Sequence, residues 1–209
     1  EDGMTPNLNV IFSERTNTYN PQRIQIQDFE LSIEDYSYHV LGGCDSATIK
    51  ATGSVLSAWT IANWLRLGVE IYTDKAQPVW WGYVHEVEIQ QDMLQFATSL
   101  DSMTNRVAVA YSFVEPGSQT VGTRKTTAWA DNLESQTEYG IKALLSSGAG
   151  MSDAAAIKLR SAILSVKSWP QGGISQTGSQ NKRLTPQPGR AITATLRCRG
   201  WWETLKWQY

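Results

Sequence analysis

The sequence predicts a mainly β protein with a minor α part, and three observations lead to this fold class. The chain has 209 residues, of which 41% are hydrophobic and 18% charged, a balance typical of a folded protein with a sizeable core. It contains nine tryptophans and 16 glycines, which suit sheets with aromatic cores and tight turns. Residues 78–90 follow a period of two, as a strand with one buried face does.

We expect the rest of the chain to be organised around this long strand. Pro78 cannot donate to a ladder and therefore sets where the strand begins. Gly82 is the natural place for a bend, at a corner of a barrel wall. The predicted inward face consists of Val79, Trp81, Tyr83, Val87 and Ile89, and the opposite face of Trp80, Gly82, Val84, Glu86, Glu88 and Gln90.

Short strands and one helix are expected before the long strand. Apolar residues at steps of three and four over residues 55–67 predict a short amphipathic helix, which Gly68 would close at the C′ position. A turn-rich loop is expected over residues 13–22. Alternating runs bounded by turn residues predict strands at 9–12, 23–29, 36–40, 47–51 and 69–72.

A helical pair is predicted after the next strands, which we place at residues 93–97, 106–114 and 123–129. Ser135 and Glu138 have the spacing of a capping box for the first helix, and Gly148-Ala149-Gly150 is predicted to be a turn. Ser152 caps the second helix, which Pro170 ends. Its predicted apolar stripe is Ala155, Ala156, Leu159, Ala162, Ile163 and Val166.

This order of elements predicts four segments. Residues 1–130 form a first β-barrel domain, and residues 131–170 form a helical segment inserted before the last strands. Residues 171–190, rich in glycine and proline, form a long loop of the kind that often makes interactions. Residues 191–209 are closing strands, which we expect to continue in residues beyond this sequence.

The polar residues predict neither an enzyme nor a cofactor or metal site. His39 and His85 lack the neighbouring ligands of a metal set, and Cys44 and Cys198 are expected to be free buried thiols. Glu86 and Glu88, on one strand face, would lie roughly 6.6 Å apart, within the range of glycosidase carboxylates. Neighbouring carboxylates are, however, ordinary on the solvent face of a strand. A net charge of −2 argues against a nucleic-acid surface.

Adjacent tryptophans are the strongest sign of a contact surface. Trp80-Trp81 and Trp201-Trp202 each lie in an expected strand, so one member of each pair points away from the core. An outward tryptophan is costly to expose unless a helix, a neighbouring subunit or a sugar covers it. We therefore predict subunit contacts at Trp80 or Trp81, with Trp80 the first to test, at Trp201 or Trp202, and in the 171–190 loop.

Several stretches taken in order resemble the tail and baseplate hub proteins of long-tailed, siphovirus-like bacteriophages. They cover residues 36–209 and include Val69-Glu70-Ile71-Tyr72 and Pro78-Val79-Trp80-Trp81-Gly82-Tyr83-Val84. The series continues with Ser135-Gln136-Thr137-Glu138-Tyr139-Gly140, the helix that ends at Pro170, and Gly200-Trp201-Trp202-Glu203-Thr204-Leu205-Lys206-Trp207. At 209 residues the chain is short for a complete hub protein.

The resemblance implies a structural virion protein without catalytic residues or a cofactor. Such proteins are built from antiparallel β-barrel domains of tail-hub type, and they form a closed homo-oligomeric ring at the phage tail tip. A homotrimer is expected, with a hexamer as the alternative. The ring would join the tail tube or distal tail protein to the central spike or fibre, and its channel would pass the tape-measure protein and DNA. We expect assembly in the bacterial host cytoplasm, with neither specific nucleic-acid binding nor membrane insertion.

Three alternatives remain open on the sequence. The chain could be a distal tail protein, which forms a hexameric ring from similar barrels. It could instead be a carbohydrate-binding β-sandwich, a receptor-binding module that stacks sugars on exposed tryptophans. A glycosidase that uses Glu86 and Glu88 is the third.

Overall fold

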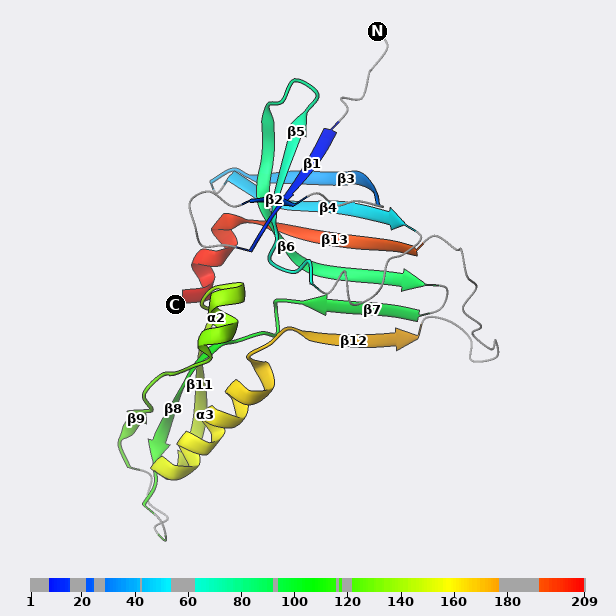
Figure 1. The fold of residues 1–209 in the computed structure, drawn as a ribbon. Coiled ribbons are helices and arrows are strands. Elements are labelled where there is room, and N and C mark those ends of the chain that lie inside the picture. Colours follow the sequence, from blue (N-terminus) through cyan, green and yellow to red (C-terminus); the bar gives the residue numbers. More distant parts are fainter. Residues whose placement is uncertain are drawn as a thin grey trace. The chain divides into compact units, whose positions relative to one another are not determined.

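The computed structural model describes residues 8–15, 22–24, 29–41, 43–53, 63–91, 94–115, 117, 122–176 and 192–208. The fold is mainly β with a minor helical part, as predicted (Figure 1). The chain divides into two compact units. Unit 1 consists of Glu1–Asp101 and Gly172–Thr204, and unit 2 of Ser102–Gln171 and Leu205–Tyr209. This division differs from the predicted boundaries, because unit 2 begins well before residue 130 and interrupts unit 1.

Unit 1 is a large antiparallel sheet. Its order is β2-β1-β5-β6-β13-β4-β3, and β7 and β12 continue from β6. Because this order ends in β2 and β3, the described strands do not close into a barrel. The strands are β1 (Leu8–Ser13), β2 (Arg23–Ile24), β3 (Glu30–His39), β4 (Gly43–Gly53), β5 (Gly68–Thr73), β6 (Pro78–Gln91), β7 (Leu94–Ser99), β12 (Gln171–Gln176) and β13 (Ile192–Gly200).

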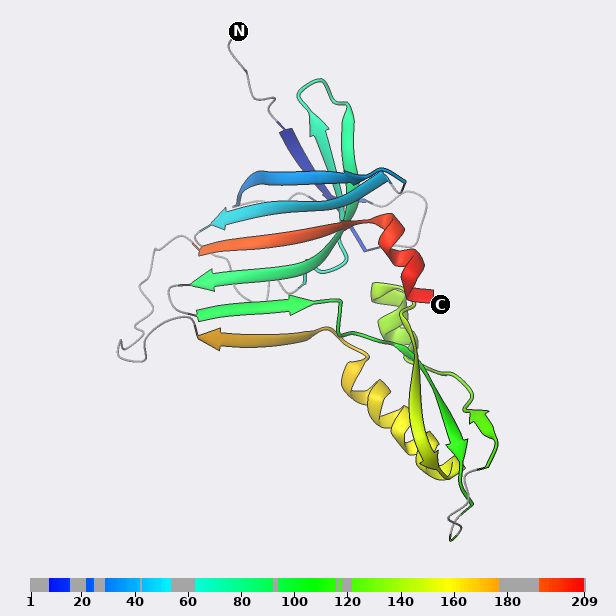
Figure 2. The ribbon, with the colours of Figure 1, turned by 180° about the vertical axis from the view of Figure 1, so that it is seen from behind.

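The long predicted strand is β6, and its two halves have different neighbours in the sheet. Its first half pairs with β5 and its second half with β7, while β13 pairs along most of its length. Figures 1 and 2 show β1 and β5 rising steeply from the plane of β3, β4 and β13. The core of unit 1 draws on both groups of strands: Phe12, Val69, Ile71, Trp80, Val84, Val87, Ile89, Ala47, Ile49, Ala51, Ala194 and Leu196.

A β-bulge at His85 decides which residues of β6 face this core. Along β13, Arg197 pairs with Glu86 and Cys198 with Val84, so His85 is the extra residue. The buried β6 residues that pair with buried residues of β13 are therefore even-numbered before the bulge (Val84) and odd-numbered after it (Val87 and Ile89). The prediction is correct for the buried Val87 and Ile89, and Tyr83 is buried on the opposite face of β6.

The predicted orientations of Trp80 and Trp81 are wrong. Trp80 is 0% exposed, whereas Trp81 is 52% exposed. A period of two carried through the bulge assigns these neighbours to the wrong faces. The described strands form no closed barrel of which Gly82 could be a corner. A Cβ at Gly82 would overlap the carbonyl oxygen of Arg199, so the glycine permits a close approach of strands.

Unit 2 is a small four-stranded sheet with two helices. Its sheet has the order β10-β8-β11, with β9 also paired to β8, and β11 runs parallel to β8. The core centres on Val109, Tyr111 and Ala156. The elements are β8 (Arg106–Phe113), β9 (Arg124–Thr126), β10 (Ala130–Asp131), α2 (Leu133–Tyr139), β11 (Ala143–Met151) and α3 (Asp153–Lys167).

The predicted helical segment therefore contains an unexpected strand. The turn predicted at Gly148-Ala149-Gly150 lies within β11. The first helix begins earlier than expected, because Asn132 caps it by accepting a hydrogen bond from the Ser135 N–H (3.1 Å). The second helix is confirmed, and the Ser152 Oγ accepts from the Ala155 N–H (3.3 Å). Of its predicted apolar stripe Ala156 is fully buried, whereas Val166 is 64% exposed.

Three further predictions concern segments that are partly described. Most of the helix predicted at 55–67 lies outside the described residues; residues 63–66 form turns, and Gly68 begins β5. Residues 171–176 of the predicted loop form β12, and the remainder lies outside the described part. Residues Trp201–Gln208 form a 3₁₀ helix, η1, where a strand was predicted. Among the described residues, no helix has the length and apolar character that crossing a membrane requires.

Candidate functional site: an aromatic corner of unit 1

Unit 1 exposes three large aromatic side chains from residues that lie next to the start of β4, at Gly43 and Cys44. Tyr38 is 54% exposed, Trp81 52% and Trp202 60%, and we call these three residues the aromatic corner. Val40 and Leu41, in the turn between β3 and β4, are almost fully exposed beside Tyr38. A monomeric protein rarely exposes so many large apolar groups together unless they take part in binding.

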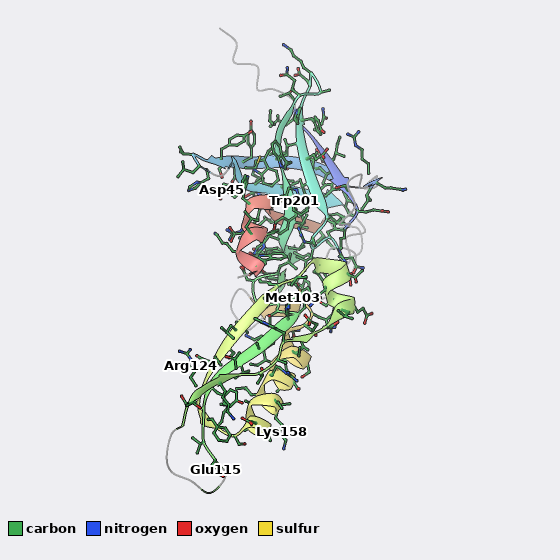
Figure 3. The ribbon with its side chains drawn as sticks, turned by 90° about the vertical axis from the view of Figure 1, so that its left-hand side faces the viewer. Asp45, Met103, Glu115, Arg124, Lys158 and Trp201 are labelled. Atoms are coloured by element: carbon green, nitrogen blue, oxygen red, sulfur yellow. The ribbon has the colours of Figure 1, made fainter. Side chains whose placement is uncertain are left out.

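The start of β4 brings the three aromatic residues together. The Trp81 N–H donates a hydrogen bond to the Cys44 Sγ (3.3 Å), and Tyr38 pairs with Cys44 across the β3–β4 ladder. The Trp202 indole packs on Gly43, where a Cβ would lie 3.4 Å from the indole nitrogen. Figure 3 shows Asp45, which follows Cys44, and Trp201, which precedes Trp202, in the same region of unit 1.

The end of β13 explains why a thiol accepts the Trp81 N–H. The β6–β13 ladder ends where Gly200 pairs with Gly82, so Trp81 has no partner on β13. Gly200 lets the chain pass Cys44 closely, because a Cβ at residue 200 would overlap the Cys44 carbonyl oxygen. Cys44 and Cys198 are both free and buried, as predicted. Burial raises the pKa of the Cys198 thiol, which keeps it protonated.

A cation–π cluster fixes Trp201, the residue before Trp202. The guanidinium of Arg66 lies 4.6 Å from the ring centroid of Tyr83 and 4.5 Å from that of Trp201. The two rings are themselves 5.2 Å apart. Arg66 adopts a positive φ of 70°, and its N–H donates to the Val84 carbonyl (2.8 Å). Burial lowers the pKa of Arg66 to about 10, so it remains charged at neutral pH.

The polar residues considered from the sequence make local ion pairs. Arg197 on β13 binds Glu86 (3.0 Å) and Glu88 (3.2 Å) across the ladder. His85 is buried and its Nε2 lies 2.9 Å from the Asp101 Oδ1, while His39 is exposed at the end of β3. Within the described ranges, no cluster of histidine, cysteine and carboxylate groups could hold a metal ion.

The aromatic corner includes only part of the predicted contact set. Trp202 is exposed as expected, and Trp201 is 36% exposed but packed against Arg66. Trp80 is fully buried, so the reason for assigning it a contact no longer holds. Trp81, which the sequence offered as the alternative to Trp80, is the exposed member of that pair. The sequence missed Tyr38, and the only signal available for it was the exposed pair Val40-Leu41 beside a glycine turn.

Comparisons with known proteins do not supply a function. No protein-family model matches the chain, and neither a curated protein nor a solved structure matches it. The function must therefore be argued from the site.

Proposed function

We propose that this chain is a structural subunit of a protein assembly and that the aromatic corner contacts a neighbouring chain. One observation carries the proposal: Tyr38, Trp81 and Trp202 are each more than half exposed although their backbone belongs to β3, β6 and η1. Aromatic side chains of this kind dominate the energy of protein interfaces because they bury a large area at a small loss of conformational freedom.

The exposed area is large enough to matter for binding. A tryptophan buries roughly 150–250 Å² on full burial, so covering the exposed half of Trp81 removes about 100 Å² from water. At about 25 cal/mol per Å² this contributes roughly 2.5 kcal/mol before entropic costs, and Trp202 contributes a similar amount. The backbone hydrogen bonds of β3, β6 and η1 favour binding, because a residue already held in a strand or helix loses less conformational freedom when the partner binds.

The assembly we favour is a ring at the tail tip of a long-tailed bacteriophage. This part of the proposal, including the tail-hub type of the β domain, rests on the order of sequence stretches that resemble baseplate hub proteins. In such a ring, a homotrimer or alternatively a hexamer, the corner would touch the next subunit or another tail protein. The tube or distal tail protein, the central spike or fibre, and the tape measure are the expected neighbours.

A sugar-binding module is the second candidate, because exposed tryptophans also stack on carbohydrates. The surroundings of the corner favour protein over sugar. Val40 and Leu41 are exposed beside Tyr38 and offer no side-chain hydrogen bond to sugar hydroxyl groups. Binding of the isolated chain to a glycan array would support the sugar-binding alternative.

Replacement of Trp202 by serine tests the proposal. We expect Trp202→Ser to reduce the native mass of the assembly, measured by light scattering, while the circular dichroism spectrum is unchanged. Leu133→Ser is the matched control, since Leu133 is 72% exposed on α2 in unit 2 and its loss should leave the mass unchanged. Equal masses for the natural chain and Trp202→Ser would contradict the proposal.

A further inference from the structure

The outer edge of β11 in unit 2 has no partner among the described strands. In the order β10-β8-β11, β11 pairs only with β8. It has nine residues, and the pairing is regular from Ala143 to Gly148 before an irregularity that ends at Met151. A regular strand edge carries a row of backbone donors and acceptors that can pair with another chain.

The backbone groups that point outward can be identified. The Lys142 N–H donates to the Asn105 Oδ1 (2.8 Å), and the Lys142 carbonyl accepts from the Arg106 N–H (3.2 Å), so both groups of Lys142 face β8. Along a strand the hydrogen-bonding side alternates from residue to residue. The N–H and carbonyl groups of Ala143, Leu145 and Ser147 therefore face away from β8.

The regular part of this edge, Ala143–Gly148, carries none of the usual protection against pairing. Proteins protect exposed edges with charges, prolines, bulges or short strands. β11 (Ala143–Met151) contains no charged residue and no proline, and Leu145 is 57% exposed.

Other described edges are better protected. β3 carries Glu30, Glu34 and Asp35 and two register shifts, and β9 is three residues long with Arg124 and Lys125. β12 is uncharged but has adjacent glycines, 172 and 173, near its start, and these weaken a strand. The glycines of β11, 148 and 150, lie at the end of its regular pairing and beyond it. Among these edges, the regular stretch of β11 is therefore the least protected.

We propose that β11 pairs with β11 of a second copy of this chain, in antiparallel orientation about a twofold axis. Antiparallel self-pairing places the residue on the axis opposite its own symmetry mate, so a charge at that position would meet a like charge. The uncharged sequence of β11 removes this obstacle. With the axis at Leu145, Ala143 pairs with Ser147 of the other copy, and the outward groups form about six hydrogen bonds.

The face of the sheet that carries Leu145 fits the same arrangement. Ala143 and Arg106 are ladder partners, and together with Trp129 and Ile141 they line an open hollow of about 250 Å³. Leu145 is on the same face, because it is two residues from Ala143. Pairing about Leu145 would place the two leucines opposite each other and shield this apolar surface in both copies.

A charge-swap experiment on the full chain tests the proposal. Leu145→Lys places two lysines opposite each other and should lower the number of copies per particle about twofold in sedimentation. Leu145→Glu should have the same effect, and an equimolar mixture of the two variants should recover the natural mass. Ile157→Lys, at a position 47% exposed on α3, is the matched control and should leave the mass unchanged.

A second variant tests the same edge in case Leu145→Lys fails to fold. Ser147→Pro removes one outward N–H and leaves both hydrogen-bonding groups of Leu144 and Ser146 facing β8, so it should also halve the mass. If Leu145→Lys and Ser147→Pro both fold and keep the natural mass, or if the lysine and glutamate variants fail to recombine, the inference is wrong. The aromatic corner belongs to unit 1, so Trp202→Ser tests the proposed function separately.

Discussion

The adjacent residues Trp80 and Trp81 offer a sharp test of the fold, because the structure reverses the orientation that simple alternation predicts. The perturbation is the same change, tryptophan to alanine, at each of the two positions. Trp80 is 0% exposed and its ring lies over Gly82, whereas Trp81 is 52% exposed. We expect Trp80→Ala to be much the more destabilising.

The magnitudes follow from the buried areas. Full burial of roughly 200 Å² at about 25 cal/mol per Å² gives about 5 kcal/mol for Trp80, in line with the 3–5 kcal/mol typical of buried tryptophan to alanine changes. The side chain of Trp81 is about half buried, so we expect Trp81→Ala to lower the free energy of unfolding by only about 2 kcal/mol. The difference between the two variants should therefore be at least about 2 kcal/mol.

Urea unfolding, followed by circular dichroism at low protein concentration, measures both free energies of unfolding. A thermal melt should agree, because each kcal/mol shifts the midpoint by about 2–4 °C in a chain of this size. If Trp81→Ala proves as destabilising as Trp80→Ala, the bulge at His85 and the core assignment of β6 are wrong.

Three further predictions concern other parts of the fold. Gly82→Ala should lower the free energy of unfolding by about 1–3 kcal/mol in urea, because the added Cβ meets the Arg199 carbonyl; an unchanged midpoint would contradict the close approach. The Tyr111 hydroxyl donates to Asp153 (2.6 Å) and lowers the pKa of that carboxyl. The stability that this bond contributes is therefore present above the ordinary aspartate pKa and is lost as the pH falls through the lowered value. Tyr111→Phe should raise the Asp153 pKa in an NMR titration, and no rise would disprove the role of the hydroxyl. Asn105→Ala should destabilise unit 2 by about 2–4 kcal/mol in thermal unfolding, because this fully buried amide bonds two backbone groups, and a loss under 1 kcal/mol would count against that role.

The sequence predicted the β-rich class and most of the strands because their apolar residues alternate and their turns are rich in glycine. It also located the start of α3, because the hydroxyl of Ser152 caps a helix through a local interaction. It failed at β11, whose run Ala143-Leu144-Leu145-Ser146-Ser147-Gly148 has no alternation that distinguishes a strand from a loop. Tertiary pairing with β8, rather than local preference, makes this segment a strand.

The candidate site could be predicted only in part for a similar reason. A tryptophan pair in a strand does imply that one member points outward, and this inference is correct for Trp80-Trp81. Which member points outward depends on the bulge at His85, and that bulge is visible only in the pairing with Arg197 and Cys198. Tyr38 joins the site through the register of β3 with β4, which no local pattern encodes.

The native mass of the chain in solution tests the central claim most directly. A ring of 23.3 kDa subunits has a mass of about 70 kDa for three copies or about 140 kDa for six, and pairing of two rings through β11 would double either mass. We predict such particles for the natural chain, and smaller, folded particles when Trp81 and Trp202 are both replaced by serine. A natural chain that stays monomeric at every concentration, or a double variant that keeps the full mass, would contradict the claim.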